Sequence, residues 1–169
     1  MNPSLAARPL VMNFFLGAFT HKVDGKGRVF VPRPILDAVE RPEERTHFFL
    51  TLGLDDCLYL FTQEGFASHL ESLDPSAFGD EVSRATALGL GSVARKVSVD
   101  SQGRILLPDD LRARAGIGAE VAVIGALDHV QIWDAGIWKK GRAAEAEAAF
   151  RSHAPGVFRG DSNSDGGGR

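Results

Sequence analysis

The sequence predicts a β-dominated α+β fold made of two tandem copies of one unit. The stretches "VDGKGRVFVP" (23–32) and "VDSQGRILLP" (99–108) are identical at five positions and lie 76 residues apart (99 − 23). In each, a turn separates two short apolar strands, and proline ends the second strand because it cannot donate to a β-ladder. A short helix, a pair of strands and a further helix follow each stretch, so the duplication covers most of the chain.

The first copy is expected to contain strands, then a helix, then paired strands and two further helices. They fall at 14–23 (strand), 28–31 (strand), 34–39 (helix), 47–61 (two strands), 63–73 (helix) and from Ser76 to about Leu90 (helix).

The second copy repeats this order. Its elements are expected at 94–99 (strand), 104–108 (strand), 109–117 (helix), 119–134 (two strands) and 135–153 (helix). Either Asp109 or Asp110 is expected to cap the short helix. In the paired strands, Gly53 matches Gly125 at a spacing of 72 (125 − 53), so the first copy carries four additional residues before this point.

These repeats divide the chain into six segments. We expect a flexible N-terminal extension (1–12), a first domain (13–62), a helical linker (63–92), a second domain (93–138), a C-terminal helix (139–154) and a disordered tail (155–169).

The charge is acidic overall but basic around the repeated stretch. The net charge of −3 argues against a protein that coats nucleic acid along its whole surface. Residues 21–36 nevertheless carry a local balance of +3, and residues 94–104 carry +2. This local charge is compatible with a localised interface for a polyanion at the repeats.

Several other classes of function lack a signal. The five histidines and the single Cys57 show no metal-ligand spacing, and Cys57 in "DDCLYLF" is expected to be a small buried residue. We find no catalytic, nucleotide-binding or cofactor motif, and we therefore predict neither an enzyme nor a cofactor. The apolar runs are far shorter than a membrane span, and one cysteine favours a reducing compartment, so we expect a cytoplasmic protein.

Most of the repeated stretch can be explained by hairpin geometry alone. Asp24 and Asp100 begin the turns, and Gly27 and Gly103 end them, as tight turns require. The apolar runs "VFV" and "ILL" do not alternate clearly, which predicts strands that are buried on both faces.

Arg28 and Arg104 need a further explanation, because a solvated residue after the turn glycine could equally be Lys, Thr or Glu. In one interpretation, each arginine pairs with the aspartate four residues earlier and braces the turn. In the other, it reaches outward to a phosphate or to a guanine edge. A guanidinium group suits both roles, because it presents a planar fork of hydrogen-bond donors.

Two such motifs in one chain resemble a known family. "FLGAFTHKVDGKGRVFVPRPIL" followed by "VDSQGRILLP" closely resembles the MraZ proteins, which carry two domains of the AbrB/SpoVT swapped-hairpin type, each marked by Asp-x-x-x-Arg. The resemblance covers about residues 13–140. It implies a double-split β-barrel in which the two copies are related by a pseudo-two-fold axis.

The resemblance also implies a function. MraZ proteins are bacterial transcriptional regulators that bind repeated sites upstream of the operon for cell division and cell-wall synthesis, and they assemble into rings. By similarity, we expect a nucleoid-associated homo-oligomer with Arg28 and Arg104 on its DNA-binding surface, aided by the turn residues of both motifs.

The local charge suggests further contacts to phosphate. We expect Lys22, Lys26, Arg95 and Lys96 to contribute them. The first copy has Lys26 and Arg33 where the second has Gln102 and Asp109, so the first hairpin is expected to bind phosphate more strongly.

An alternative function is a protein-interaction or antitoxin-like module of the same fold that makes no direct contact with DNA. Antitoxins of related fold combine one hairpin domain with a disordered arm. Two fused copies and a short tail argue against this alternative.

Overall fold

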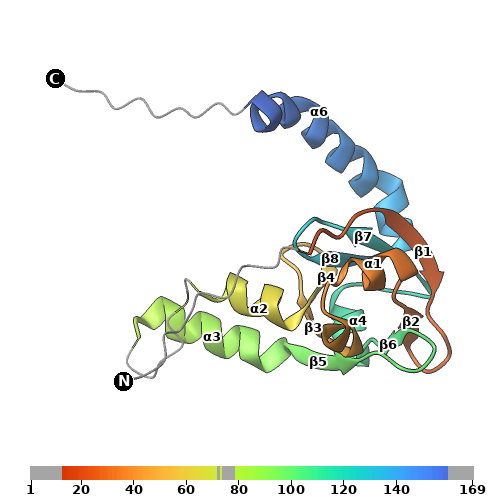
Figure 1. Cartoon of the computed structure of the whole chain (residues 1–169), viewed down its shortest axis with the longest axis vertical. Coiled ribbons are helices and arrows are strands. Elements are labelled where there is room, and N and C mark those ends of the chain that lie inside the picture. The colour runs from red at the N-terminus through yellow and green to blue at the C-terminus, as the bar shows by residue number, and fades with distance from the viewer. Residues whose placement is uncertain (1–12, 72, 74–78, 160–169) are drawn as a thin grey trace. The chain divides into compact units, whose positions relative to one another are not determined.

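The computed structural model of the chain describes residues 13–71, 73 and 79–159 (Figure 1). The chain divides into two units, Met1–Ala135 and Gly136–Arg169. The expected extension over 1–12 lies outside the described residues. The first unit contains β1 (Ala18–Lys22), β2 (Arg28–Phe30), α1 (Arg33–Ala38), the 3-10 helix η1 (Pro42–Thr46), β3 (His47–Leu52), β4 (Cys57–Phe61), α2 (Gln63–His69), α3 (Glu81–Val93), β5 (Arg95–Ser98), β6 (Arg104–Leu106), α4 (Asp109–Arg114), β7 (Glu120–Gly125) and β8 (Val130–Asp134).

The two copies build one sheet between them, which confirms a mixed, strand-rich α+β fold. A six-stranded antiparallel sheet has the order β1-β7-β8-β4-β3-β5, and β2 and β6 form a separate two-stranded ladder. Strand β1 of the first copy pairs with β7 of the second, and β5 of the second pairs with β3 of the first. When each strand is replaced by its counterpart in the other copy, the sheet has the same strand order, read from the opposite edge.

The β2–β6 ladder buries only one of its faces. Val29 and Ile105 are each 1% exposed and lie in the same core as Ile35 of α1 and Leu111 of α4. Between the buried positions, Phe30 is 45% exposed and Leu106 is 51% exposed. The prediction that these runs are buried on both faces is therefore wrong, because a short two-stranded ladder packs one face on the core and alternates its side chains.

The two long hairpins differ by one residue at their turns. Leu52 pairs with Leu58, whereas Gly125 pairs with Val130, so the second connection is one residue shorter. Gly125 is therefore the equivalent of Leu52, and the match of Gly53 with Gly125 from the sequence is wrong in register. The shorter turn places Leu127 at a φ of 70°, in the left-handed region that favours glycine.

The first described residues pack against this second turn. Phe15, which is 1% exposed, exchanges two backbone hydrogen bonds with Leu127, at 2.7 and 3.1 Å. The backbone of Phe15 and Leu16 passes so close to Gly125 that a Cβ atom there would collide with it. Glycine at position 125 is thus required by a close approach of two chain segments.

The helices differ from expectation mainly at their ends. Helix α2 ends at His69, and α3 begins after Asp80, whose Oδ1 accepts the Ser83 N–H at 2.9 Å; the expected start at Ser76 lies outside the described residues. Pro108 occupies the N-cap position of α4, so the expectation that Asp109 or Asp110 caps this helix is wrong, because both residues lie inside its first turn. The Asp109 carboxylate pairs with Arg112. Cys57 is 1% exposed, as expected.

The second unit is helical in its described part. It contains the end of α5 (Ala135–Ile137), the π-helix η2 (Trp138–Arg142) and α6 (Ala143–Arg159). Helix α6 continues through Pro155, so the expected tail begins inside this helix, and residues 160–169 lie outside the description. Among the described residues, no helix combines the length and apolar character that a membrane span requires.

Candidate nucleic-acid interface

The repeated motif forms a tight turn with a defined glycine position. The Asp24 N–H donates to the Arg28 carbonyl at 2.9 Å, and the Gly27 N–H donates to the Asp24 carbonyl at 2.9 Å. Gly27 has a φ of 81°, and its counterpart Gly103 has a φ of 80°. A three-residue loop that ends in a left-handed residue explains why glycine stands at both positions.

The aspartate side chain holds this turn together. Asp24 Oδ1 accepts the backbone N–H groups of Lys26 and Arg28 at 2.9 Å each, and Asp24 Oδ2 accepts Arg28 Nε at 2.8 Å. Asp100 makes the same three contacts with Gln102 and Arg104, each at 2.9 Å. The pairing of arginine with the aspartate four residues earlier is therefore confirmed in both copies.

These hydrogen bonds stabilise the ionised form of each aspartate. The backbone N–H of Arg28, helped by that of Lys26 and by the Arg28 side chain, lowers the pKa of Asp24 from 3.8 to about 2. The backbone N–H of Arg104 is the main cause that lowers the pKa of Asp100. Both turns therefore carry a full negative charge beside each arginine at neutral pH.

The two turns sit at opposite ends of the β2–β6 ladder. The Leu107 N–H donates to the Gly27 carbonyl, and the Val31 N–H donates to the Gly103 carbonyl, each at 2.9 Å. Arg104 nevertheless reaches across, and its Nη1 lies 3.5 Å from Asp24 Oδ2. The four charged groups of the two motifs thus form one cluster on this ladder.

The two arginines are not equivalent within this cluster. Arg104 is 17% exposed and uses both Nη atoms, one toward Asp24 and one toward Asp100. Arg28 is 31% exposed and binds Asp24 through Nε, and its Nη atoms donate to no group in the described part of the chain. Arg28 can therefore brace its turn and still offer two donors to an external acceptor, so the two interpretations of this residue are compatible.

The outer face of the ladder also presents apolar side chains that were not expected from the sequence. The Arg104 Cζ atom lies 5.9 Å from the centre of the Phe30 ring, and the His21 ring lies 6.1 Å from it. Leu106 stands beside Arg28 in the ladder register. The sequence does contain a signal for these residues. In the runs "VFV" and "ILL", alternation along a strand points the middle side chain, Phe30 or Leu106, to the face opposite the buried residues.

The remaining basic residues do not gather at this cluster. Lys22 ends β1 and faces Glu120, whereas Lys96 lies in β5, at the opposite edge of the six-stranded sheet. Arg95 donates to the Ser92 and Ala94 carbonyls at 2.9 and 3.2 Å and pairs with Asp110 at 3.3 Å. Of the basic residues expected at the interface, Lys26, exposed in its turn, is the one that shares a motif with Arg28.

The fold also exchanges the helices that accompany the turns. The turn of the first copy lines a cavity with Asp109 and Arg112 of α4, which belongs to the second copy. The turn of the second copy lines a cavity with Arg33 of α1, which belongs to the first. Arg33 therefore lies beside the second turn, which has Gln102 in place of a lysine. From the sequence, Arg33 is grouped instead with Lys26 and the first turn.

Two histidines that are far apart in the sequence meet at one carboxylate. His69 Nε2 lies 2.9 Å from Asp128 Oδ2, and His129 Nδ1 lies 2.8 Å from Asp128 Oδ1. Gln131 links the His129 ring to Trp133 Nε1, at 3.1 and 2.9 Å. Within the described ranges, no group of three or more His, Cys, Asp or Glu side chains is arranged to hold a metal ion.

Comparison with known proteins places this chain in a family. The family model described as "MraZ protein, putative antitoxin-like" matches residues 14–87 and again residues 92–157. The chain belongs to the MraZ family. The two matches coincide with the two copies of the repeated unit, so each Asp-x-x-x-Arg turn lies within a matched MraZ segment.

Similar proteins occur in several bacteria. A protein named transcriptional regulator MraZ from Desulforamulus reducens is 35% identical over 85% of this chain and 96% of its own length. Proteins with the same name from Thermomicrobium roseum and Paenarthrobacter aurescens are each 38% identical, over 79% and 80% of this chain and 87% and 91% of their own lengths. These names describe regulators of transcription rather than enzymes.

Proposed function

We propose that this MraZ-family chain is a transcriptional regulator that binds DNA through its two Asp-x-x-x-Arg turns. The observation that carries the proposal is the asymmetric arginine pair: Arg28 is braced by Asp24 yet keeps its Nη atoms available at an exposed ladder. A rigidly held guanidinium group is suited to a phosphate or to a guanine edge. The names of the relatives support the same conclusion.

In this proposal the basic residues have different roles. Arg28 and Lys26 make the main contacts, and Arg104 chiefly positions Asp24 and Asp100. Lys22 and Lys96 are exposed and can meet phosphates at the edges of the sheet, whereas Arg95 first has to leave its carbonyl and carboxylate partners. The target is a set of repeated sites upstream of the operon for cell division and cell-wall synthesis, contacted by a cytoplasmic, nucleoid-associated protein.

We further propose that the two copies form a swapped-hairpin double-split barrel and that chains assemble into a ring. The exchanged pairing of β1 with β7 and of β5 with β3 supports the barrel. A candidate self-association patch surrounds the Phe15–Leu127 bridge, where Phe14, Leu16 and Leu127 are 55%, 60% and 57% exposed. A ring would present several turns to successive DNA sites and so raise the overall affinity.

The proposal can be tested with labelled duplex DNA from upstream of the protein's own gene and a scrambled duplex of equal composition. We expect tighter binding to the natural duplex, with a steep decrease in affinity as salt rises. Arg28→Ala should abolish this preference while the oligomer stays intact. Arg84→Ala, which removes an exposed arginine on α3, is the control and should bind as the wild type does. Equal affinity of the wild type for both duplexes would contradict the proposal.

A protein-interaction module of the same fold is the second candidate. The exposed Phe30 and Leu106 favour it, because they give the ladder an apolar outer face. This candidate predicts that Phe30→Ser impairs function in cells while DNA affinity is unchanged. The DNA-binding proposal predicts that Arg28→Ala has the stronger effect on both.

A further inference from the structure

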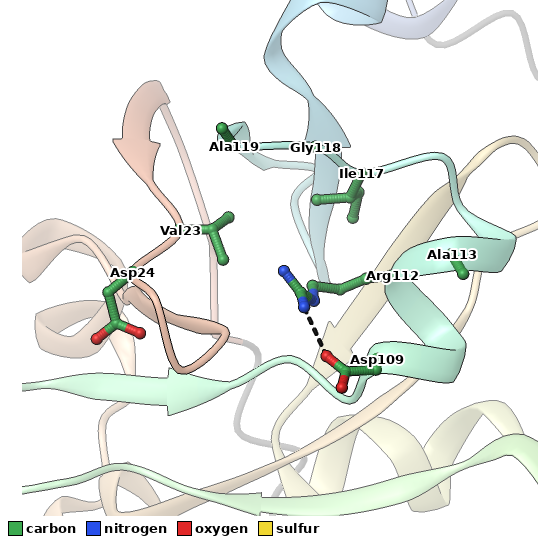
Figure 2. A pocket seen from close by; sticks show the side chains of 8 residues that line it. All are labelled: Val23, Asp24, Asp109, Arg112, Ala113, Ile117, Gly118 and Ala119. Carbon is green, nitrogen blue, oxygen red and sulfur yellow. Dashed lines mark hydrogen bonds and ion pairs between the residues drawn. The ribbon is translucent and has the colours of Figure 1, made fainter.

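A cavity of about 440 Å³ lies between the first turn and α4 (Figure 2). Val23 and Asp24 line it from the first turn, and Ile117, Gly118 and Ala119 line it from the segment that leads into β7. Helix α4 contributes Asp109, Arg112 and Ala113. The cavity thus lies between the turn of one copy, which we propose contacts DNA, and a helix of the other.

The Arg112 side chain extends into this cavity and lies against the turn. Figure 2 shows it reaching from α4 toward Val23. A Cβ atom on Gly27 would be 3.6 Å from both Cζ and Nη2 of Arg112, so the guanidinium group rests on the turn glycine. Its Nε atom is buried and has no hydrogen-bond partner among the described residues. A buried donor without an acceptor is unfavourable, so an anion that reached this part of the guanidinium group through the cavity would offset the cost.

The present partner of Arg112 is weakly held. Arg112 Nη2 lies 2.5 Å from Asp109 Oδ1, but the Asp109 side chain is 91% exposed and hence strongly solvated. Asp24 does not compete, because its oxygens already accept hydrogen bonds from Lys26 and Arg28, and Oδ2 also lies 3.5 Å from Arg104 Nη1. An anion that enters the cavity therefore has to displace the solvated Asp109 carboxylate, and it also meets the charge of Asp24, which is already paired with Arg28 and Arg104.

The other copy shows that packing does not require a charge at this position. Leu36 stands 76 residues before Arg112 and packs on the turn glycine of the second copy, 3.7 Å from a Cβ on Gly103. An aliphatic side chain is thus sufficient to support the turn. The guanidinium group of Arg112 is therefore an addition that the fold itself does not need.

We propose that this cavity is a phosphate-binding site anchored by Arg112. A guanidinium fork binds phosphate oxygens through paired N–H groups, and Val23, Ala113 and Ile117 offer an apolar wall to the group that carries the phosphate. The phosphate comes either from a DNA backbone beside Lys26 or from a free phosphorylated molecule. Binding of a DNA backbone phosphate rests on the proposed function, whereas binding of a free phosphorylated molecule does not.

The first test uses the full-length protein and inorganic phosphate, with sodium chloride at matched ionic strength as the reference. The NMR signal of the Arg112 Nε–H and the melting temperature are followed. We expect both to shift with phosphate in the wild type and in Arg114→Leu, an exposed arginine on the same helix. Arg112→Leu, which copies the natural Leu36, should fold normally and bind phosphate about tenfold or more weakly.

A second variant keeps the proposal testable if Arg112→Leu does not fold. Asp109→Asn removes the competing carboxylate and leaves the arginine in place, so phosphate binding should become tighter. Weaker or unchanged binding in this variant would overturn the proposal. So would identical phosphate responses of the wild type and a folded Arg112→Leu.

The source of the phosphate is then distinguished with DNA. The salt dependence of operator binding is measured for the wild type, Arg112→Leu and Arg114→Leu. If the backbone is the source, the slope of log affinity against log salt should decrease in magnitude by about 0.9 for Arg112→Leu alone. An unchanged slope together with phosphate binding assigns the site to a free ligand. If the wild type fails to bind DNA, the proposed function fails while the phosphate result stands.

Discussion

Val29 pairs with Ile105 at the centre of the β2–β6 ladder, and the two residues are 76 positions apart (105 − 29), the interval of the repeated stretch itself. Each therefore faces its own counterpart. The same holds at the centre of the large sheet, where Tyr59 pairs with Gln131, 72 positions away (131 − 59). Both antiparallel pairs thus join equivalent residues of the two copies. The charged cluster of the two motifs lies on the ladder that contains the first of these pairs.

Removing the turn carboxylate should reduce stability at neutral pH but not in strong acid. The pKa of Asp24 falls to about 2 on folding from 3.8, so its contribution is present above pH 3.8 and is lost as the pH falls toward 2. We expect Asp24→Asn to be less stable than the wild type at pH 7, with the difference vanishing near pH 2. Urea unfolding across this range measures it. Asp56→Asn, at an exposed turn position, is the control, and a gap that stays constant with pH would contradict the prediction.

Arg104 should matter more for stability than Arg28. Arg104 contacts the carboxylates of both copies and is 17% exposed, whereas Arg28 contacts one and is 31% exposed. Arg104→Ala should lower the free energy of unfolding by about 1–2 kcal/mol, and Arg28→Ala by less than about 1 kcal/mol. Chemical denaturation of both variants at pH 7 tests the order. Equal losses would show that the contact across the ladder contributes nothing.

Glycine in place of Leu127 should stabilise the protein. The left-handed conformation costs a residue with a Cβ about 1–2 kcal/mol, and glycine avoids it at a smaller cost in backbone entropy. We expect Leu127→Gly to raise the free energy of unfolding by up to about 1 kcal/mol, since its 57% exposed side chain loses little packing. Leu54→Gly, in the longer turn, is the control and should give no gain. A loss of stability in Leu127→Gly would mean that the side chain packs in the assembled protein.

Alanine at Gly125 should detach the segment around Phe15. Its Cβ would collide with the backbone of Phe15 and Leu16, and overpacking of this kind costs about 1–3 kcal/mol. Hydrogen exchange at the Phe15 and Leu127 amides should accelerate in Gly125→Ala. Gly25→Ala is the control, because no atom lies within 4 Å of its added Cβ and serine stands at this place in the second copy. Unchanged exchange in Gly125→Ala would show that the segment can shift without loss.

The sequence by itself determined the elements whose causes are local. The two turns with Asp24 and Asp100 and their left-handed glycines follow from residues within five positions of one another, and the duplication can be read directly from the repeated letters. For each arginine, the ion pair with its aspartate is one of two interpretations of the sequence, and the structure contains this pair. Turn geometry and side-chain reach decide these features, and they do not depend on distant parts of the chain.

Only the tertiary structure decided how the copies share their parts. The exchange of β1 and β5 between copies places α4 beside the first turn and α1 beside the second, so Lys26 is accompanied by Arg112 rather than by Arg33. The different availability of Arg28 and Arg104 and the cavity at Arg112 depend on how the two copies pair. The pairing partner of a strand depends on residues that lie tens of positions away, and a pattern read within each copy carries no information about them.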